Sequence, residues 1–122
     1  LESPREQLHI FDAMPPEEQD RFLSMSIDRQ PQSADRIEQL VTAWSRGDLA
    51  TMDAETRNEL AGFPDLLHAL MVARNERWAA WMRSRLDQPG VLFVAVGAGH
   101  LAGDQSVPAL LERGGVRVER MQ

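Results

Sequence analysis

Hydrophobic residues recur every three or four positions through most of the first 87 residues, a spacing typical of helices that bury one face. Prolines and glycines separate these periodic segments from one another. A capping box, Ser3-Pro4-Arg5-Glu6, marks the start of the first helix. The pattern predicts helices over 4–14, 16–30, 33–46, 48–52 and 63–86, with a weakly amphipathic connector over 53–62.

The longest predicted helix, 63–86, carries an apolar stripe that one charged residue interrupts. The stripe consists of Leu67, Met71, Trp78 and Trp81, and Arg74 lies in its middle. An unpaired buried charge is very costly, so this guanidinium needs a partner. Arg74 is therefore predicted either to form a buried salt bridge or backbone cap, or to serve in a site. Tryptophans 44, 78 and 81 are all predicted to belong to the core.

A different pattern begins at residue 91, where six apolar residues follow one another without a polar break. Such a run suits a strand that is covered on both faces. A helix is expected over 105–113, and the alternation over 116–121 predicts a second strand. Strand, helix and strand in this order form a βαβ unit with a parallel strand pair.

The expected fold class is therefore helix-rich α/β. Helices occupy residues 1–87, and the βαβ unit occupies 88–122. A chain of 122 residues has room for a single domain, but two strands are too few for a stable sheet. We expect further strands to come from a larger α/β domain or from a second copy of the chain. The start at Leu1 favours a trimmed or mature piece of a longer protein.

Charge and composition exclude several classes of function. The net charge is −6 and no basic cluster is present, so nucleic acid is a poor partner. The absence of cysteine excludes disulfides and thiolate catalysis. No apolar run approaches the roughly 20 residues that a membrane span needs.

The strongest site candidate follows directly after the run at 91–96, where Gly97-Ala98-Gly99-His100 occurs. Ligands of open α/β sheets bind beyond the carboxyl ends of the strands, which is where His100 would lie. The glycines allow a sharp turn and a close approach of another group. A neutral imidazole there suits a divalent metal such as zinc, whereas the alternative is a turn histidine bonded to the backbone.

Four blocks of sequence together resemble the C-terminal portion of the TraB/GumN family, which includes the Tiki proteases and the pheromone-shutdown protein PrgY. The blocks are Leu1-Glu2-Ser3 with Glu6-Gln7-Leu8, then 43–48, 74–78 and 93–103, and they occur in the family's order and spacing. The resemblance covers essentially the whole chain. It implies a metal-dependent peptidase fold with two Gly-x-x-His motifs and an essential glutamate and arginine.

Site roles follow from this resemblance, residue by residue. His100 would be a metal ligand in the second Gly-x-x-His motif, with Gly97 and Gly99 beside the substrate. Glu2 would be the general base and Arg74 would stabilise developing negative charge. For Glu2 the alternative is a frayed terminus. The family also suggests a bacterial protein that acts on peptides or proteins outside the cytoplasm.

The chain departs from the family because it contains no other Gly-x-x-His. We therefore expect this piece to be inactive alone and to bind zinc, cobalt or manganese only weakly, since catalytic zinc usually takes three protein ligands. The alternative function is a non-catalytic helical binding module on the same scaffold.

Overall fold

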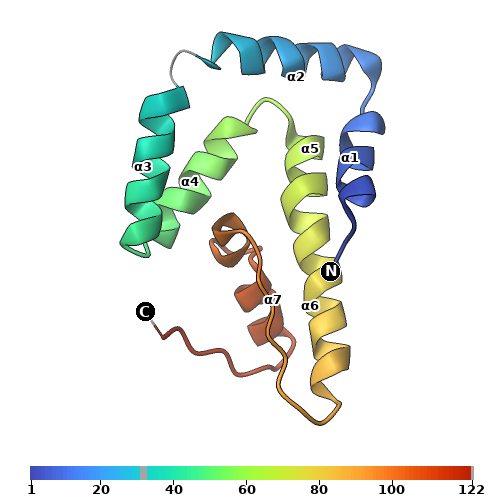
Figure 1. The fold of residues 1–122 in the computed structure, drawn as a ribbon. Coiled ribbons are helices and arrows are strands. Elements are labelled where there is room, and N and C mark those ends of the chain that lie inside the picture. The colour runs from blue at the N-terminus through green and yellow to red at the C-terminus, as the bar shows by residue number, and fades with distance from the viewer. Residues whose placement is uncertain (31–32, 122) are drawn as a thin grey trace.

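The computed structural model describes residues 1–30 and 33–121, which form helices joined by short connections (Figure 1). The α-helices are α1 (Pro4–Asp12), α2 (Pro16–Asp28), α3 (Ser33–Ser45), α4 (Leu49–Glu59), α5 (Pro64–Leu67), α6 (Ala73–Leu86) and α7 (Val107–Arg113). A π-helical turn, η2 (His68–Val72), joins α5 to α6, and a 3₁₀ turn, η3 (Ala98–Leu101), precedes α7.

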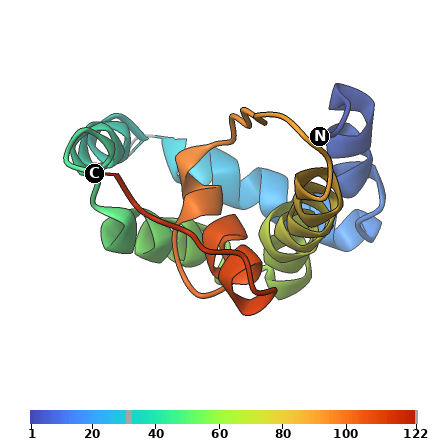
Figure 2. The same cartoon turned by 90° about the horizontal axis from the view of Figure 1, so that it is seen from below.

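The long column formed by α5, η2 and α6 organises the other elements. In Figure 1, α1 runs beside this column, α2 crosses the top, and α3 and α4 pack together on the opposite side. Helix α7 packs against α6, and η3 packs against α4. Figure 2, seen from below, shows the C-terminal segment running from α7 toward α3, where the Arg120 guanidinium donates to the Gly47 carbonyl. Both terminal segments thus contact elements from the middle of the sequence, α1 at η2 and Arg120 at Gly47.

Local sequence explains where several helices begin. The predicted capping box is confirmed: the Glu6 amide donates to the Ser3 hydroxyl, and Glu6 Oε2 accepts from the Ser3 amide at 2.6 Å. The Ser106 hydroxyl caps α7 by accepting from the Ala109 amide at 3.3 Å.

The predicted connector over 53–62 is largely wrong, because α4 continues to Glu59. Asp48 caps this helix by accepting the Thr51 amide at 3.0 Å. The residues that follow include Met, Ala, Glu and Arg, which favour helix without forming a clear apolar stripe. Intrinsic propensity and a cap therefore prevailed over the weak periodicity.

The predicted βαβ unit over 88–122 is wrong, and so is the α/β class. No strand occurs in residues 1–30 and 33–121, and of the three elements predicted for the unit only the helix is present, as α7. Residues 91–96 still alternate, since Val94 and Val96 pack inward whereas Val91 and Phe93 are exposed. No backbone hydrogen bond joins these residues to another described residue. Strand propensity alone does not make a sheet, because a ladder needs a partner.

Two separate clusters form the core. One consists of Leu60, Phe63 and Leu66 with partners from α1 and α2. The other joins Trp78 and Met82 of α6 to Val107 of α7. Only one of the three tryptophans behaves as predicted: Trp78 is 5% exposed, whereas Trp44 is 65% and Trp81 46% exposed. The second cluster lies directly behind the candidate site.

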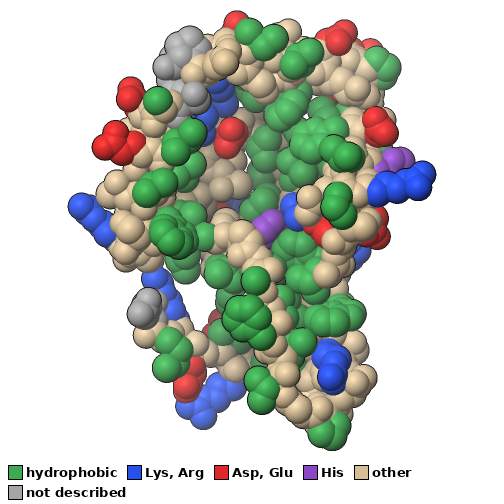
Figure 3. All heavy atoms as spheres, in the orientation of Figure 1, with side chains coloured by type: hydrophobic (Ala, Val, Ile, Leu, Met, Phe, Trp, Pro, Cys, Tyr) green, Lys and Arg blue, Asp and Glu red, His purple; other side chains and the backbone are tan. Residues whose placement is uncertain are grey.

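Much of the apolar surface is left uncovered. Figure 3 shows hydrophobic side chains exposed on several elements of one face, with charged side chains mainly toward its edges. Among the described residues, no helix is both long and apolar enough to cross a membrane.

Candidate functional site

A cavity of about 360 Å³ lies where the N-terminal segment, α6 and the residues around η3 meet. Its lining consists of Leu1, Glu2, Gln7, Arg74, Trp78, Ala95, Val96, Gly97 and His100. Four of the five predicted site residues therefore share one cavity, although they come from three distant parts of the sequence. Gly99 is the exception, because a Cβ placed on it would contact Thr56 and Met71 at 3.5 Å, on the α4 side.

The motif glycines differ in what they require. Gly97 has an extended backbone with φ −60°, and a Cβ there would meet nothing closer than 3.8 Å. Gly103, the last residue of the block 93–103, has φ +82°, and a Cβ placed on it would lie 2.5 Å from Asp53 Oδ1. The predicted need for glycine in a sharp turn is therefore not seen at Gly97 or Gly99, and the position that requires glycine is Gly103.

Glu2 and Arg74 form an ion pair inside the cavity, with side chains only 8% and 13% exposed. Glu2 Oε1 also accepts from Gln7 Nε2 at 2.8 Å, and Arg77 lies 3.7 Å from Oε2. Burial is the largest single effect and raises the pKa of the Glu2 carboxyl. Hydrogen bonds from Arg74 and Gln7 and the positive charges of Arg74 and Arg77 together lower this pKa by more than burial raises it. The net shift is downward, so the carboxylate is ionised and held in place rather than frayed.

The Arg74 side chain is fixed on several sides. It donates to the Leu70 carbonyl at 2.9 Å, and its guanidinium carbon lies 4.8 Å from the centre of the Trp78 ring. This stacking is a cation–π contact. Its Nε is buried without a hydrogen-bond partner among residues 1–30 and 33–121, as is Trp78 Nε1. Of the alternatives left open for Arg74, the structure shows the buried salt bridge, with Glu2 as the acidic partner, and the site role of Arg74 stays a prediction.

His100 is 7% exposed and packs against the Trp78 ring, with ring centres 4.6 Å apart. Its Nδ1 lies 2.6 Å from Oδ1 of Asn75, so the ring is bonded to a side chain rather than to the backbone. Asn75 in turn donates to the Gln105 carbonyl at 2.7 Å.

Sequence reasoning missed Asn75, which is 2% exposed. Two signals could have found it. It follows Arg74 directly, and it lies three residues before the buried Trp78, which places both on one face of a helix.

The imidazole is neutral at physiological pH. Burial is the main cause that lowers the pKa of His100, to about 4, the charge of Arg74 lowers it too, and the charge of Glu2 opposes this. His100 therefore takes up a proton near pH 6.5 in the unfolded chain but only at a lower pH in the folded chain.

This difference predicts that stability falls on acidification. Between pH 7 and pH 5 the unfolded state binds more protons, so the free energy of unfolding should drop by about 2 kcal/mol. Glu2 stays ionised in this window because its pKa is lowered. Urea denaturation at both pH values measures the drop. A His100→Gln variant should lose it, and an equal drop in that variant would contradict the assignment.

The described residues do not complete a metal site. Within residues 1–30 and 33–121, no group of three His, Cys, Asp or Glu side chains is placed to hold a metal ion. His100 offers one nitrogen, and the Glu2 carboxylate is already paired with Arg74. Catalytic zinc usually has three protein ligands. This donor set is therefore insufficient by itself.

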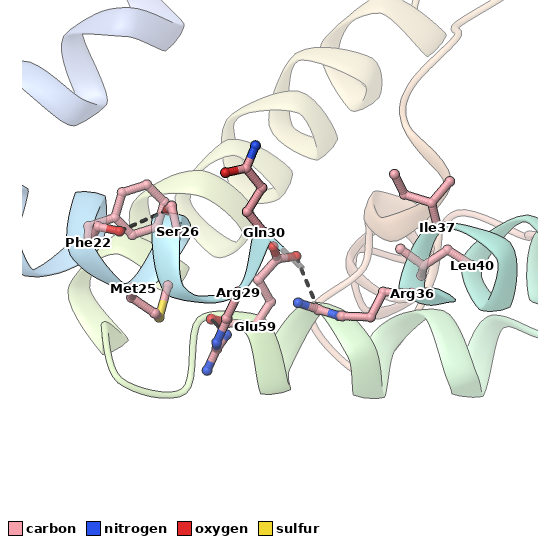
Figure 4. A pocket seen from close by; sticks show the side chains of 9 residues that line it. All are labelled: Phe22, Met25, Ser26, Arg29, Gln30, Arg36, Ile37, Leu40 and Glu59. Carbon is pink, nitrogen blue, oxygen red and sulfur yellow. Dashed lines mark hydrogen bonds and ion pairs between the residues drawn. The ribbon is translucent and has the colours of Figure 1, made fainter. Parts of the chain in front are cut away.

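A second cavity, of about 320 Å³, lies between α2, α3 and α4 (Figure 4). Its apolar lining includes Phe22 and Leu40. Arg36 lies 3.7 Å from the Glu59 carboxylate, and Arg29 donates to the backbone carbonyl of Glu59 at 3.0 Å. The charged side chains described in its lining, Arg29, Arg36 and Glu59, are thus all engaged within the protein.

Comparison with known proteins agrees with the resemblance seen in the sequence. The model of the TraB/PrgY/gumN family matches residues 1–120. No curated protein and no solved structure gave a match. Because the match covers nearly the whole chain and includes every residue of the cavity, the chain belongs to the TraB/PrgY/gumN family.

Proposed function

We propose that this chain carries part of the active site of a peptidase-like, metal-dependent hydrolase. The observation that supports this most is the meeting of Glu2, Arg74 and His100 in one cavity. A carboxylate, a guanidinium and a neutral imidazole are the groups that hydrolysis of an acyl bond uses. Peptides or proteins are the proposed substrates.

The proposed site needs metal ligands beyond those that the described residues, 1–30 and 33–121, offer. The proposed cofactor is zinc, cobalt or manganese, and His100 is one of its ligands in the complete protein. A second Gly-x-x-His segment, which this sequence does not contain, would provide further ligands. The chain alone is therefore expected to be inactive.

The test uses the natural gene product that contains these residues. Hydrolysis of a peptide library should require a divalent metal and should be lost in His100→Gln. A His68→Gln variant is the matched control, since His68 lies outside the cavity. Residues 1–122 alone should show no sub-micromolar zinc site by calorimetry. Metal-independent hydrolysis, or full activity in His100→Gln, would refute the proposal.

The second candidate is a non-catalytic binding module. It is favoured by the ion pair, because Glu2 and Arg74 already satisfy one another. In that case the gene product would bind peptides without cleaving them under any of the three metals. Binding of peptides without cleavage by the unaltered gene product would then separate the module from the enzyme.

We further propose that the extended segment 91–97 pairs with a strand of a second copy or of a segment outside residues 1–122. Residues 91–96 lack backbone hydrogen-bond partners among the described residues, and Phe93 is 89% exposed. The run 91–96 carries no charge, so two copies can approach without repulsion. An unpaired apolar edge invites strand addition.

This pairing predicts that residues 1–122 self-associate as their concentration rises. Light scattering coupled to gel filtration should show a mass above 13.7 kDa, the mass of one chain. Phe93→Glu should restore the monomer without unfolding it, because the side chain is exposed. Trp44→Glu is the control for a second exposed aromatic residue, on α3. A monomer at all concentrations would contradict pairing between two copies of residues 1–122.

A further inference from the structure

The side-chain amide of Asn75 has a defined orientation. Its Nδ2 lies 2.7 Å from the backbone oxygen of Gln105, and its Oδ1 lies 2.6 Å from His100 Nδ1. The reversed orientation would set Oδ1 against the Gln105 oxygen, so two acceptors would face one another without a proton. The backbone carbonyl oxygen of Gln105 can only accept a hydrogen bond. It therefore requires Nδ2 of Asn75 on its side and leaves Oδ1 facing His100.

This orientation decides which ring nitrogen carries the proton. An amide oxygen only accepts, so the nitrogen opposite Oδ1 must donate. We infer that Asn75 is a positioning residue that holds His100 in the Nδ1–H tautomer and leaves the lone pair on Nε2. The partner of one ring nitrogen fixes the state of the other.

The free nitrogen is available to a ligand. Nε2 makes no hydrogen bond to any residue in the described ranges, yet it is not among the polar atoms sealed from solvent. His100 lines the cavity of about 360 Å³. The Nδ1–H tautomer thus presents an acceptor, not a donor, to whatever enters beside the ring.

The support behind Asn75 is rigid. Asn75 lies in α6 and is 2% exposed, so its amide cannot exchange its partners for water. The ring is fixed on another side by Trp78. Metal-binding histidines commonly donate their second nitrogen to a carbonyl or carboxylate oxygen, which sets ring orientation. That use of Nε2 rests on the proposed function, whereas the tautomer follows from the hydrogen bonds alone.

Nuclear magnetic resonance tests the tautomer on ¹⁵N-labelled chain at pH 7. Long-range proton–nitrogen correlations distinguish a protonated ring nitrogen from one with a lone pair, and His9→Gln and His68→Gln variants assign the three rings. We expect His100 to show a protonated Nδ1 and a lone pair on Nε2. A proton on Nε2 and a lone pair on Nδ1 would overturn the inference, whether or not any variant folds.

Two variants test the role of Asn75. Asn75→Leu removes the acceptor at similar size and should convert His100 to the Nε2–H form or to a mixture of the two tautomers. Gln105→Ala, which keeps the backbone carbonyl, should leave the tautomer unchanged. An unaltered Nδ1–H form in folded Asn75→Leu would overturn the positioning role. Absence of hydrolysis by the natural gene product, together with the expected tautomer in the chain, would count against the proposed function only.

Discussion

Replacing Arg74 by methionine is expected to lower the free energy of unfolding by about 3–5 kcal/mol, the usual cost of breaking a buried ion pair from one side. The variant keeps the length and apolar bulk of the side chain, so packing on Trp78 is largely preserved. What is lost is the partner of Glu2, whose carboxylate is 8% exposed. Gln7 and the more distant Arg77 compensate only in part.

The control for this variant is Arg77→Met. Arg77 also faces Glu2, but its side chain is 60% exposed, and pairs of this kind contribute at most about 1 kcal/mol. Urea unfolding followed by circular dichroism measures both. Glu2→Gln combined with Arg74→Met should recover part of the loss, because no charge is left alone. The ion pair would have no structural role if Arg74→Met cost no more than Arg77→Met.

Replacing Trp78 by alanine should be similarly damaging, with a loss of about 3–5 kcal/mol. The indole packs with Met82 and Val107, and it also contacts the ring of His100 and the guanidinium of Arg74. The cavity left behind would border two site residues, so their positions should loosen as the core weakens.

Trp81→Ala supplies the comparison, since Trp81 lies on the same helix and is 46% exposed. Its removal should cost about 1 kcal/mol or less, as for surface substitutions in general. The urea midpoints of the two variants give the difference directly. Equal losses would mean that the cluster of Trp78, Met82 and Val107 does not carry the stability assigned to it.

Local signals in the sequence were sufficient for most helices. Ser3, Glu6 and the prolines act over three or four residues, so their effect can be recognised without knowing the fold. Resemblance to a family then indicated Glu2, Arg74 and His100, which the structure places in one cavity. Their proposed chemistry remains to be tested.

What could not be predicted depends on partners that are distant in the sequence. Whether residues 91–96 form a strand is decided by a neighbouring strand, and propensity cannot supply one. Local sequence could place Asn75 beside Arg74 on the face of Trp78, but its partners, His100 25 residues later and a backbone carbonyl, leave no local pattern. Residues 53–59 show the opposite case. Their intrinsic helix propensity was sufficient to form a helix, and the lack of an apolar stripe led to the wrong prediction of a connector.

The π-helical turn at 68–72 bears on how this family can tolerate insertions and deletions. Each residue of an α-helix turns the chain by about 100°, so a turn with one extra residue changes which side every later residue faces. Deleting one residue from 68–72 would allow a regular helix, with better intrinsic geometry, yet it would swing Arg74 and Asn75 away from Glu2 and His100. A gap of one residue at this point in a related sequence therefore predicts that the related protein lacks both the Glu2–Arg74 ion pair and the Asn75–His100 hydrogen bond.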